Sequence, residues 1–241
     1  MRVVSLAPSA TNVVAALDAA DRLVGRTTHC DAALDAAAVG GWLNPDCGAV
    51  ADRDPDVVLT SDGLQAEIRD DLRDRGLDVH HVEPATLDDV LASFATVGEA
   101  VGLPERGERL EADCRARVAA VREHAPADPA DRPVVYCEEW ADPPMAAGNW
   151  VPDAVQAAGG RYPFVSPGER SRAVDPAVVD EADPDHAVVH ICGTGDRTDA
   201  DPAARWGLDA AVHVVDDSLL NQPSPRLVDG IEELARCLRE D

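Results

Sequence analysis

One long, uninterrupted helix pattern divides this sequence. Residues 104–124, PERGERLEADCRARVAAVREH, begin with a proline that suits a first helical position. Leu110, Cys114, Val118 and Val121 recur at helical spacing, so one stripe of the helix is apolar and the rest is charged. At about 1.5 Å per residue this helix would extend about 30 Å, which is the width of a small domain. The pattern predicts a single helix that connects two lobes.

Short apolar runs alternate with helical patterns on both sides of that helix. The predicted strands cover residues 3–7, 23–27, 56–60, 79–82, 133–138, 187–191 and 212–215. The predicted helices follow Pro8 and cover residues 64–75, 87–101, 151–158, 203–204 and 225–238, and Ser9 or Thr11 is expected to cap the first of them. Strands separated by helices predict an α/β fold with mainly parallel, Rossmann-like sheets. The predicted domains are an N-terminal lobe (1–103), an interlobe helix (104–124) and a C-terminal lobe (125–241).

The charge of the chain excludes some partners. The formal net charge is -25, and all 21 basic side chains are arginines. Acidic surfaces of this kind are typical of proteins from salt-loving archaea, so the acidity indicates an environment and not a binding site. Nucleic acid needs a basic stripe, which the sequence lacks, and no apolar run is long enough to enter a membrane.

The start of the chain and its cysteines bear on location. Residues 2–7 already form a predicted strand, so no secretory signal is visible. As the sequence stands we expect a cytoplasmic monomer, and an extracytoplasmic one if the native start lies upstream. None of the six cysteines forms a CxxC pair, and without export they are expected to be free thiols.

The loops that follow the predicted strands are the candidate ligand site, because open α/β sheets bind ligands beyond the carboxyl ends of their strands. Aromatic residues make up only 3% of the chain, so Trp140 and Trp150, ten residues apart around a Pro-Pro turn, favour a large flat ligand. The alternative is that both indoles cover the core of the second lobe. The candidate ligand-binding residues are Pro8, Ser9, Thr11, His29, Trp42, Ser61, Asp62, Gly63, Trp140, Asp142, Pro143, Asn149, Trp150, Cys192 and Gly193.

Four segments resemble a known family. They are VVSLAPSATNVVAALDAADRLVGRTTHCD, VGGWLNPDCGAVADRDPDVVLTSDGLQAEIRDDL, EEWADPPMAAGNWVPDAVQAAGG and SPRLVDGIEELA. Together they resemble the vitamin B12-binding type of ABC-transporter substrate-binding proteins, in the helical-backbone class that also contains siderophore and heme binders. The resemblance implies two α/β lobes bridged by one helix, with a corrinoid (cobalamin or cobinamide) as ligand and no catalytic cofactor. The EWADPPMAAGNW segment is the part that points to corrinoids.

The resemblance also implies a partner. Proteins of this class dock onto an ABC-transporter permease through one glutamate on each lobe. Glu67, in GLQAEIRDDL, matches the first glutamate. The second would precede the SPR of the last helix, where this chain has Asn221, Gln222 and Pro223.

Two other interpretations remain open. His29 and Cys30, or His190 and Cys192, have side chains that could bind the metal of a chelate such as heme or an iron siderophore, although loop hydrogen bonding and core packing are the simpler roles. A metal-dependent hydrolase using His29, Asp31 and His190 is the enzyme alternative. The chain lacks a nucleophile elbow, a Walker loop, a GxGxxG turn and an HExxH pair. We therefore expect no catalysis, no catalytic residue and no protein-held metal.

Overall fold

The computed structural model describes residues 1–31 and 33–239, which form two compact units. The first unit contains residues 1–84 and 91–113, and the second contains residues 85–90 and 114–241. This division splits the long helix between the units, whereas the sequence suggested residues 104–124 as a separate segment.

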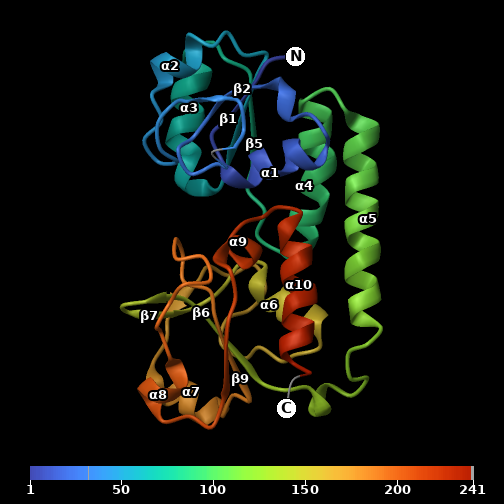
Figure 1. Cartoon of the computed structure of the whole chain (residues 1–241), viewed down its shortest axis with the longest axis vertical. Helices are drawn as coiled ribbons and strands as arrows, with labels where there is room; N and C mark the ends of the chain where they lie inside the picture. Colours follow the sequence, from blue (N-terminus) through green and yellow to red (C-terminus); the bar gives the residue numbers. More distant parts are fainter. Residues whose placement is uncertain (32, 240–241) are drawn as a thin grey trace. The chain divides into compact units, whose positions relative to one another are not determined.

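The first unit contains a sheet of five parallel strands in the order β3-β2-β1-β4-β5 (Figure 1). Every residue of the central strands β1 and β4 is buried, as expected where helices cover both faces of a parallel sheet. Valine and leucine side chains from these strands and their neighbours form the core. The strands are β1 (Val3–Ser5), β2 (Leu23–Arg26), β3 (Ala37–Ala38), β4 (Val57–Ser61) and β5 (Val79–Val82), and the helices are α1 (Pro8–Ala16), α2 (Cys47–Ala51), α3 (Ala66–Asp74), α4 (Leu87–Ala100) and α5 (Pro104–Arg122).

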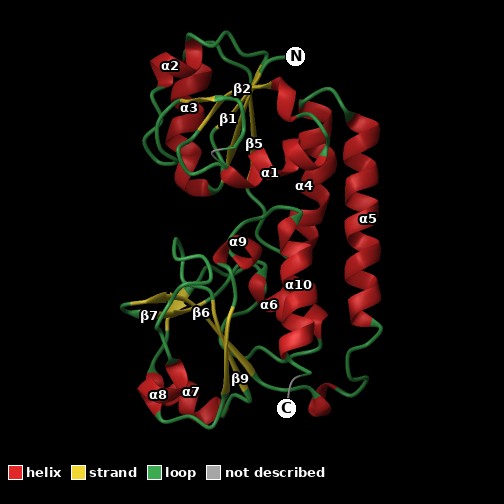
Figure 2. Cartoon of the chain, in the orientation of Figure 1, coloured by secondary structure: helices red, strands yellow, loops and turns green. Residues whose placement is uncertain are grey.

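The second unit contains a mixed sheet in the order β10-β9-β6-β7-β8 (Figure 2). Strands β10, β9 and β6 are parallel, and β7 and β8 extend the sheet as antiparallel strands. The strands are β6 (Val135–Ala141), β7 (Pro144–Ala146), β8 (Arg172–Ala173), β9 (His186–Val189) and β10 (Ala211–Val214), and the helices are α6 (Val151–Ala158), α7 (Pro176–Ala182), α8 (Pro202–Trp206), α9 (Asp217–Leu220) and α10 (Arg226–Cys237). The prediction of two mainly parallel α/β sheets is confirmed.

The long helix α5 begins at Pro104, as predicted, and buries Cys114 and Val118 of the predicted stripe. Within the first unit it packs closely on α4 at a pair of glycines. A Cβ atom added to Gly98 would lie 2.6 Å from the Cα atom of Gly107, so no larger residue fits without moving a backbone.

Two local expectations are wrong. Helix α1 has Ala7 at its N-cap with no side-chain cap, because Pro8 starts the helix before Ser9 and leaves Ser9 and Thr11 inside it. Strand β6 continues to Ala141, so Trp140 lies in the strand and not in a loop after it. Among residues 1–31 and 33–239, no helix is both long enough and apolar enough to cross a bilayer.

Candidate ligand-binding site

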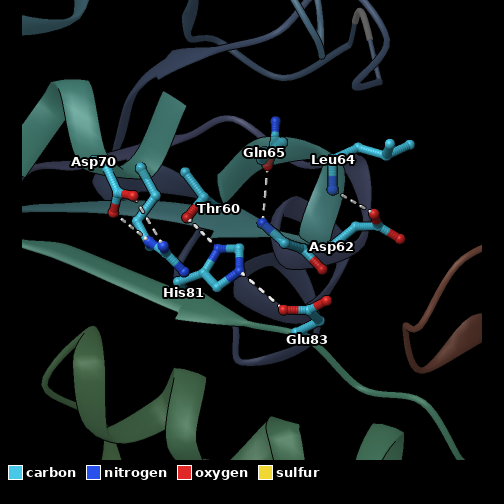
Figure 3. Close-up of polar contacts among 9 residues, drawn as sticks. Thr60, Asp62, Leu64, Gln65, Asp70, His81 and Glu83 are labelled. Carbon is cyan, nitrogen blue, oxygen red and sulfur yellow. Dashed lines mark hydrogen bonds and ion pairs between the residues drawn. The ribbon is translucent and has the colours of Figure 1, made fainter. Parts of the chain in front are cut away.

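Gln65 joins three loops at the carboxyl ends of the first-unit strands. Its side chain is fully buried, and its Oε1 accepts a hydrogen bond from the backbone N–H of Ser61 at 2.8 Å (Figure 3). Its amide nitrogen donates to the carbonyl oxygens of Leu6 at 2.9 Å and Trp42 at 2.7 Å. One amide therefore connects the loops after β1, β3 and β4. Gln65 was not among the residues predicted from the sequence.

Two of these bonds are buried and the bond to Trp42 is partly buried. Gln65→Leu is therefore expected to lower the free energy of unfolding by about 3 kcal/mol, since each buried partner left unpaired costs about 1–3 kcal/mol. Denaturant unfolding in molar salt measures the change. Gln156→Leu, at an exposed position of α6, is the matched control and should be nearly neutral. Equal stability of the two variants would contradict the role given to Gln65.

The loop after β4 combines backbone strain with an exposed apolar residue. Asp62 has φ of +76°, and its carboxylate accepts a hydrogen bond from the N–H of Leu64 at 2.8 Å, which holds the turn formed by Gly63–Gln65 (Figure 3). The side chain of Leu64 is 55% exposed, and that of Leu43, one residue after Trp42, is 51% exposed. Burying a leucine is worth about 1.5–3 kcal/mol, so these two side chains are available to an apolar ligand. Neither leucine was among the residues predicted from the sequence, although their position in loops after strands was a usable signal.

Next to this loop, His81 of β5 forms polar contacts with residues at the ends of β4 and β5. Nδ1 of His81 lies 2.9 Å from the hydroxyl oxygen of Thr60, and Nε2 lies 3.9 Å from the carboxylate of Glu83 (Figure 3). Burial, followed by the charge of Arg69, lowers the pKa of His81. The ring is therefore neutral at pH 7 and serves as a hydrogen-bonding group.

The loops after β1 and β2 are held together by their own hydroxyls. The Thr11 hydroxyl donates to Ser5 Oγ at 2.8 Å and lies 3.1 Å from Sγ of Cys30, which is also 3.3 Å from the Thr27 hydroxyl. Thr11, Ser9 and Cys30 are buried, so the structure does not present these predicted side chains to a ligand. Pro8 is half-buried and His29 is exposed.

In the second unit, the two predicted tryptophans differ. Trp140 lies near the end of β6 and is 47% exposed, and its indole N–H donates to the carbonyl of Asp142 at 2.9 Å. Trp150 is only 7% exposed, and its N–H donates to the carbonyl of Leu220 at 2.7 Å. The indole of Trp150 thus packs in the core of the second unit, as in the alternative role that the sequence left open. Trp140 keeps an exposed indole.

The remaining predicted residues of the second unit lie on turns. Asp142 and Pro143 are exposed at the turn between β6 and β7. Asn149 has a φ of +53°, and its backbone N–H donates a hydrogen bond to the carbonyl oxygen of Glu169. Cys192 and Gly193 are exposed after β9, where the carboxylate of Asp217 accepts hydrogen bonds from the N–H groups of Gly193 and Gly195, each at 2.8 Å.

The geometry does not support the metal and hydrolase alternatives. His190 is fully buried with its Nδ1 hydrogen-bonded to Asn221, and burial lowers its pKa to about 4. Its ring therefore cannot reach a ligand without leaving the core. Although the Cys192 residue is exposed, partial desolvation of its thiol, followed by the charge of Asp217, raises its pKa and disfavours the thiolate that binds metals. Asn221, which also donates to the carbonyl of His190 at 3.1 Å, supports this strand end.

Comparison with known proteins identifies the family. The model of a family described as "Periplasmic binding protein" matches residues 3–204. The chain belongs to this periplasmic binding protein family. The family consists of solute-binding proteins.

Relatives of this substrate-binding chain include binders of different ligands. It is 28% identical to a cobalamin-binding protein of Halobacterium salinarum, over 98% of this chain and 69% of that protein. The periplasmic vitamin B12 binding protein BtuF of Vibrio cholerae has the same fold, with a TM-score of 0.79 and 21% identity over 99% of this chain and 96% of the other. The periplasmic heme-binding protein HutB of the same species has a TM-score of 0.81 and 17% identity over 100% and 99% of the two chains. The fold is thus shared by binders of both ligands and does not by itself select one.

Proposed function

We propose that this substrate-binding protein binds a corrinoid, cobalamin or cobinamide, and delivers it to an ABC-type uptake system or another corrinoid-handling step. The match to a cobalamin-binding protein over 98% of the chain carries the proposal. The exposed side chains fit it. A corrin is a broad apolar disc with amide edges. Trp140, near the end of β6, has an exposed indole, and the first unit separately exposes Leu43 and Leu64 in loops at strand ends. Asp62 and Asn149, with nearby backbone groups, offer polar contacts for the amide edges.

The test is a calorimetric titration in molar potassium chloride with cobalamin and cobinamide, alongside hemin and a ferric siderophore. Dissociation constants below about 10 µM for a corrinoid, or about 7 kcal/mol of binding free energy, are expected. Binding of hemin or the siderophore without binding of either corrinoid would move the proposal to a metal chelate of that other class.

Trp140→Ala is expected to weaken corrinoid binding by about 1–3 kcal/mol, because it removes an exposed indole whose N–H is already paired within the protein. Trp206→Ala is the control, since that indole packs against Tyr136 with ring centroids 5.4 Å apart. The control should leave affinity unchanged once both variants are shown to be folded. Trp150→Ala is unsuitable, because it would remove a core side chain. Equal affinities of the Trp140 and Trp206 variants would show that Trp140 is not a contact.

We further propose that Glu67, exposed in the first turn of α3, docks onto basic residues of a permease. Glu67→Arg should then abolish transport in vesicles that contain a cognate permease while leaving corrinoid affinity unchanged. Asp74→Arg, at the exposed far end of the same helix, supplies the matched control for charge reversal. Transport that survives Glu67→Arg would remove this residue from the docking surface.

A further inference from the structure

Two histidines meet at one edge of the second-unit sheet, away from the strand ends discussed above. His186 is the first residue of β9, and His213 is the third residue of the edge strand β10. In the register of these parallel strands, His186 pairs with Ala211 and His213 pairs with Val188, so both histidines lie on the same face as diagonal neighbours. Nδ1 of His186 and Nε2 of His213 are hydrogen-bonded at 3.0 Å, so without a metal one of these nitrogens carries the shared proton, and the ring centroids are 5.3 Å apart.

This nitrogen separation suits chelation of one ion. Metal–imidazole bonds are about 2.0–2.1 Å long, so two nitrogens on one metal are about 2.9 Å apart at a right angle and about 3.3 Å apart at a tetrahedral angle. The observed 3.0 Å is close to the right-angle value. Right angles are typical of the square-planar and octahedral sites preferred by Ni(II) and Cu(II). Each ring would need to tilt by about 45° for its lone pair to point at the shared ion, given those bond lengths.

The surroundings combine rigidity with access. His186 is 8% exposed and belongs to β9, which is hydrogen-bonded to a strand on each side, β6 and β10. His213 is only half-buried, and in the described part of the chain no further strand pairs with the outer edge of β10. One ligand is thus held in place while the other is open to solvent.

We propose that His186 and His213 form a binding site for a divalent first-row transition-metal ion of the Ni(II) or Cu(II) type, independent of the corrinoid site. Water completes the coordination, because within residues 1–31 and 33–239 no three or more His, Cys, Asp or Glu side chains are grouped to hold a metal. The carboxylate of Asp185, which accepts the N–H of Val134 at 2.7 Å, adds negative charge beside His186. A bound ion would tie the edge strand β10 to β9 through side chains as well as through the backbone.

The probe is Ni(II), because Cu(II) would be reduced by the free thiols of this chain. Calorimetry of the full chain, freed of metal by a chelator and kept in molar potassium chloride without corrinoid, should show one ion bound per chain. His213→Gln, at the more accessible ligand, should weaken this binding by more than about tenfold. His29→Gln, at an exposed histidine of the first unit, is the matched control and should bind as the unmodified chain does. Unchanged affinity of His213→Gln, or no binding to the unmodified chain at about 1 mM Ni(II), would overturn the proposal.

A second measurement needs no variant. Ni(II) is paramagnetic in octahedral sites, and zinc is a diamagnetic substitute, so imidazole NMR signals report which rings bind. Addition of either ion should broaden or shift the signals of His186 and His213 first among the seven histidines. If other histidines respond first, the ion binds elsewhere and the assignment to this pair is wrong.

Discussion

Transfer from molar to low salt is expected to unfold this protein. A net charge of -25 on 241 residues produces strong mutual repulsion among surface carboxylates in the compact state. Salt weakens that repulsion by reducing the screening length from about 10 Å at 0.1 M to about 3 Å at 1 M. Thermal unfolding followed by circular dichroism should therefore give a Tm that rises by more than about 10 °C between about 0.1 and 2 M potassium chloride, a change of several kcal/mol for a chain of this size.

The shape of the salt dependence separates charge screening from other effects of salt. Screening changes most at low concentration, so most of the rise in Tm should occur below about 0.5 M. Sucrose stabilises folded proteins by exclusion from their surface and does not screen charge, so it should not replace the salt. A Tm that stays constant across the potassium chloride series would disprove the interpretation of the acidic composition as an adaptation to salt.

Arg205→Met is expected to destabilise the second unit by about 3–5 kcal/mol, because it leaves a buried carboxylate without its cation. Glu138, on β6, is 0% exposed, and its two oxygens accept hydrogen bonds from the guanidinium of Arg205 at 2.7 and 3.0 Å. The hydroxyl of Tyr136 also donates to Glu138 at 3.1 Å. These contacts attach α8 to the buried face of β6. Chemical unfolding in molar salt measures the loss.

A double variant identifies the cause of that loss. Glu138→Gln in the Arg205→Met background removes the unpaired charge but keeps an acceptor for Tyr136, so it should restore part of the lost stability. Arg197→Met, at an exposed arginine of the same unit, controls for loss of positive charge and should be nearly neutral. If the double variant is less stable than Arg205→Met alone, the unpaired carboxylate is not the source of the effect.

Regular elements with strong local patterns were predictable from the sequence. Helix α6 covers Val151–Ala158 and strand β5 covers Val79–Val82, both as predicted. Helix α6 has a proline at its second position, a glycine directly after its last residue and several apolar residues, and all of these signals can be seen in the segment itself. The lobes were predictable for the same reason, since each is built from several such segments.

The short strands β3, β7 and β8 were not predicted, whereas the equally short β1 was, because its apolar run continues beyond the strand. Strands β3 and β8 each have two residues and β7 has three, which is too short for an alternating pattern to be visible. These strands form because neighbouring strands supply hydrogen-bonding partners. Whether such a short segment pairs at the edge of a sheet or in the antiparallel direction is decided only when the sheet assembles.

The candidate site was only partly predictable because its arrangement depends on long-range contacts. Most of the candidate loops lie at strand ends, although Trp140 belongs to β6 itself. The sequence does not show that Trp150 reaches a carbonyl 70 residues away while Trp140 stays exposed. Gln65 bonds to a carbonyl 59 residues away, and nothing local distinguishes it from a surface glutamine. Burial of polar side chains of this kind follows from the fold.

The way in which the chain is divided between the two units limits how the protein can be cut into fragments. Residues 85–90, at the start of α4, group with the second unit although residues on both sides of them group with the first. Their contacts explain this grouping, since the N–H of Leu87 donates to Asp153 at 3.1 Å and the carboxylate of Asp88 pairs with Arg115. The chain thus passes between the units three times, and no single cut releases either unit whole. A fragment ending at residue 113 would contain residues 85–90 without the unit against which they pack. The remaining fragment would lack the buried side chains of Leu87 and Val90. Separate production of either unit therefore requires circular permutation or a grafted peptide.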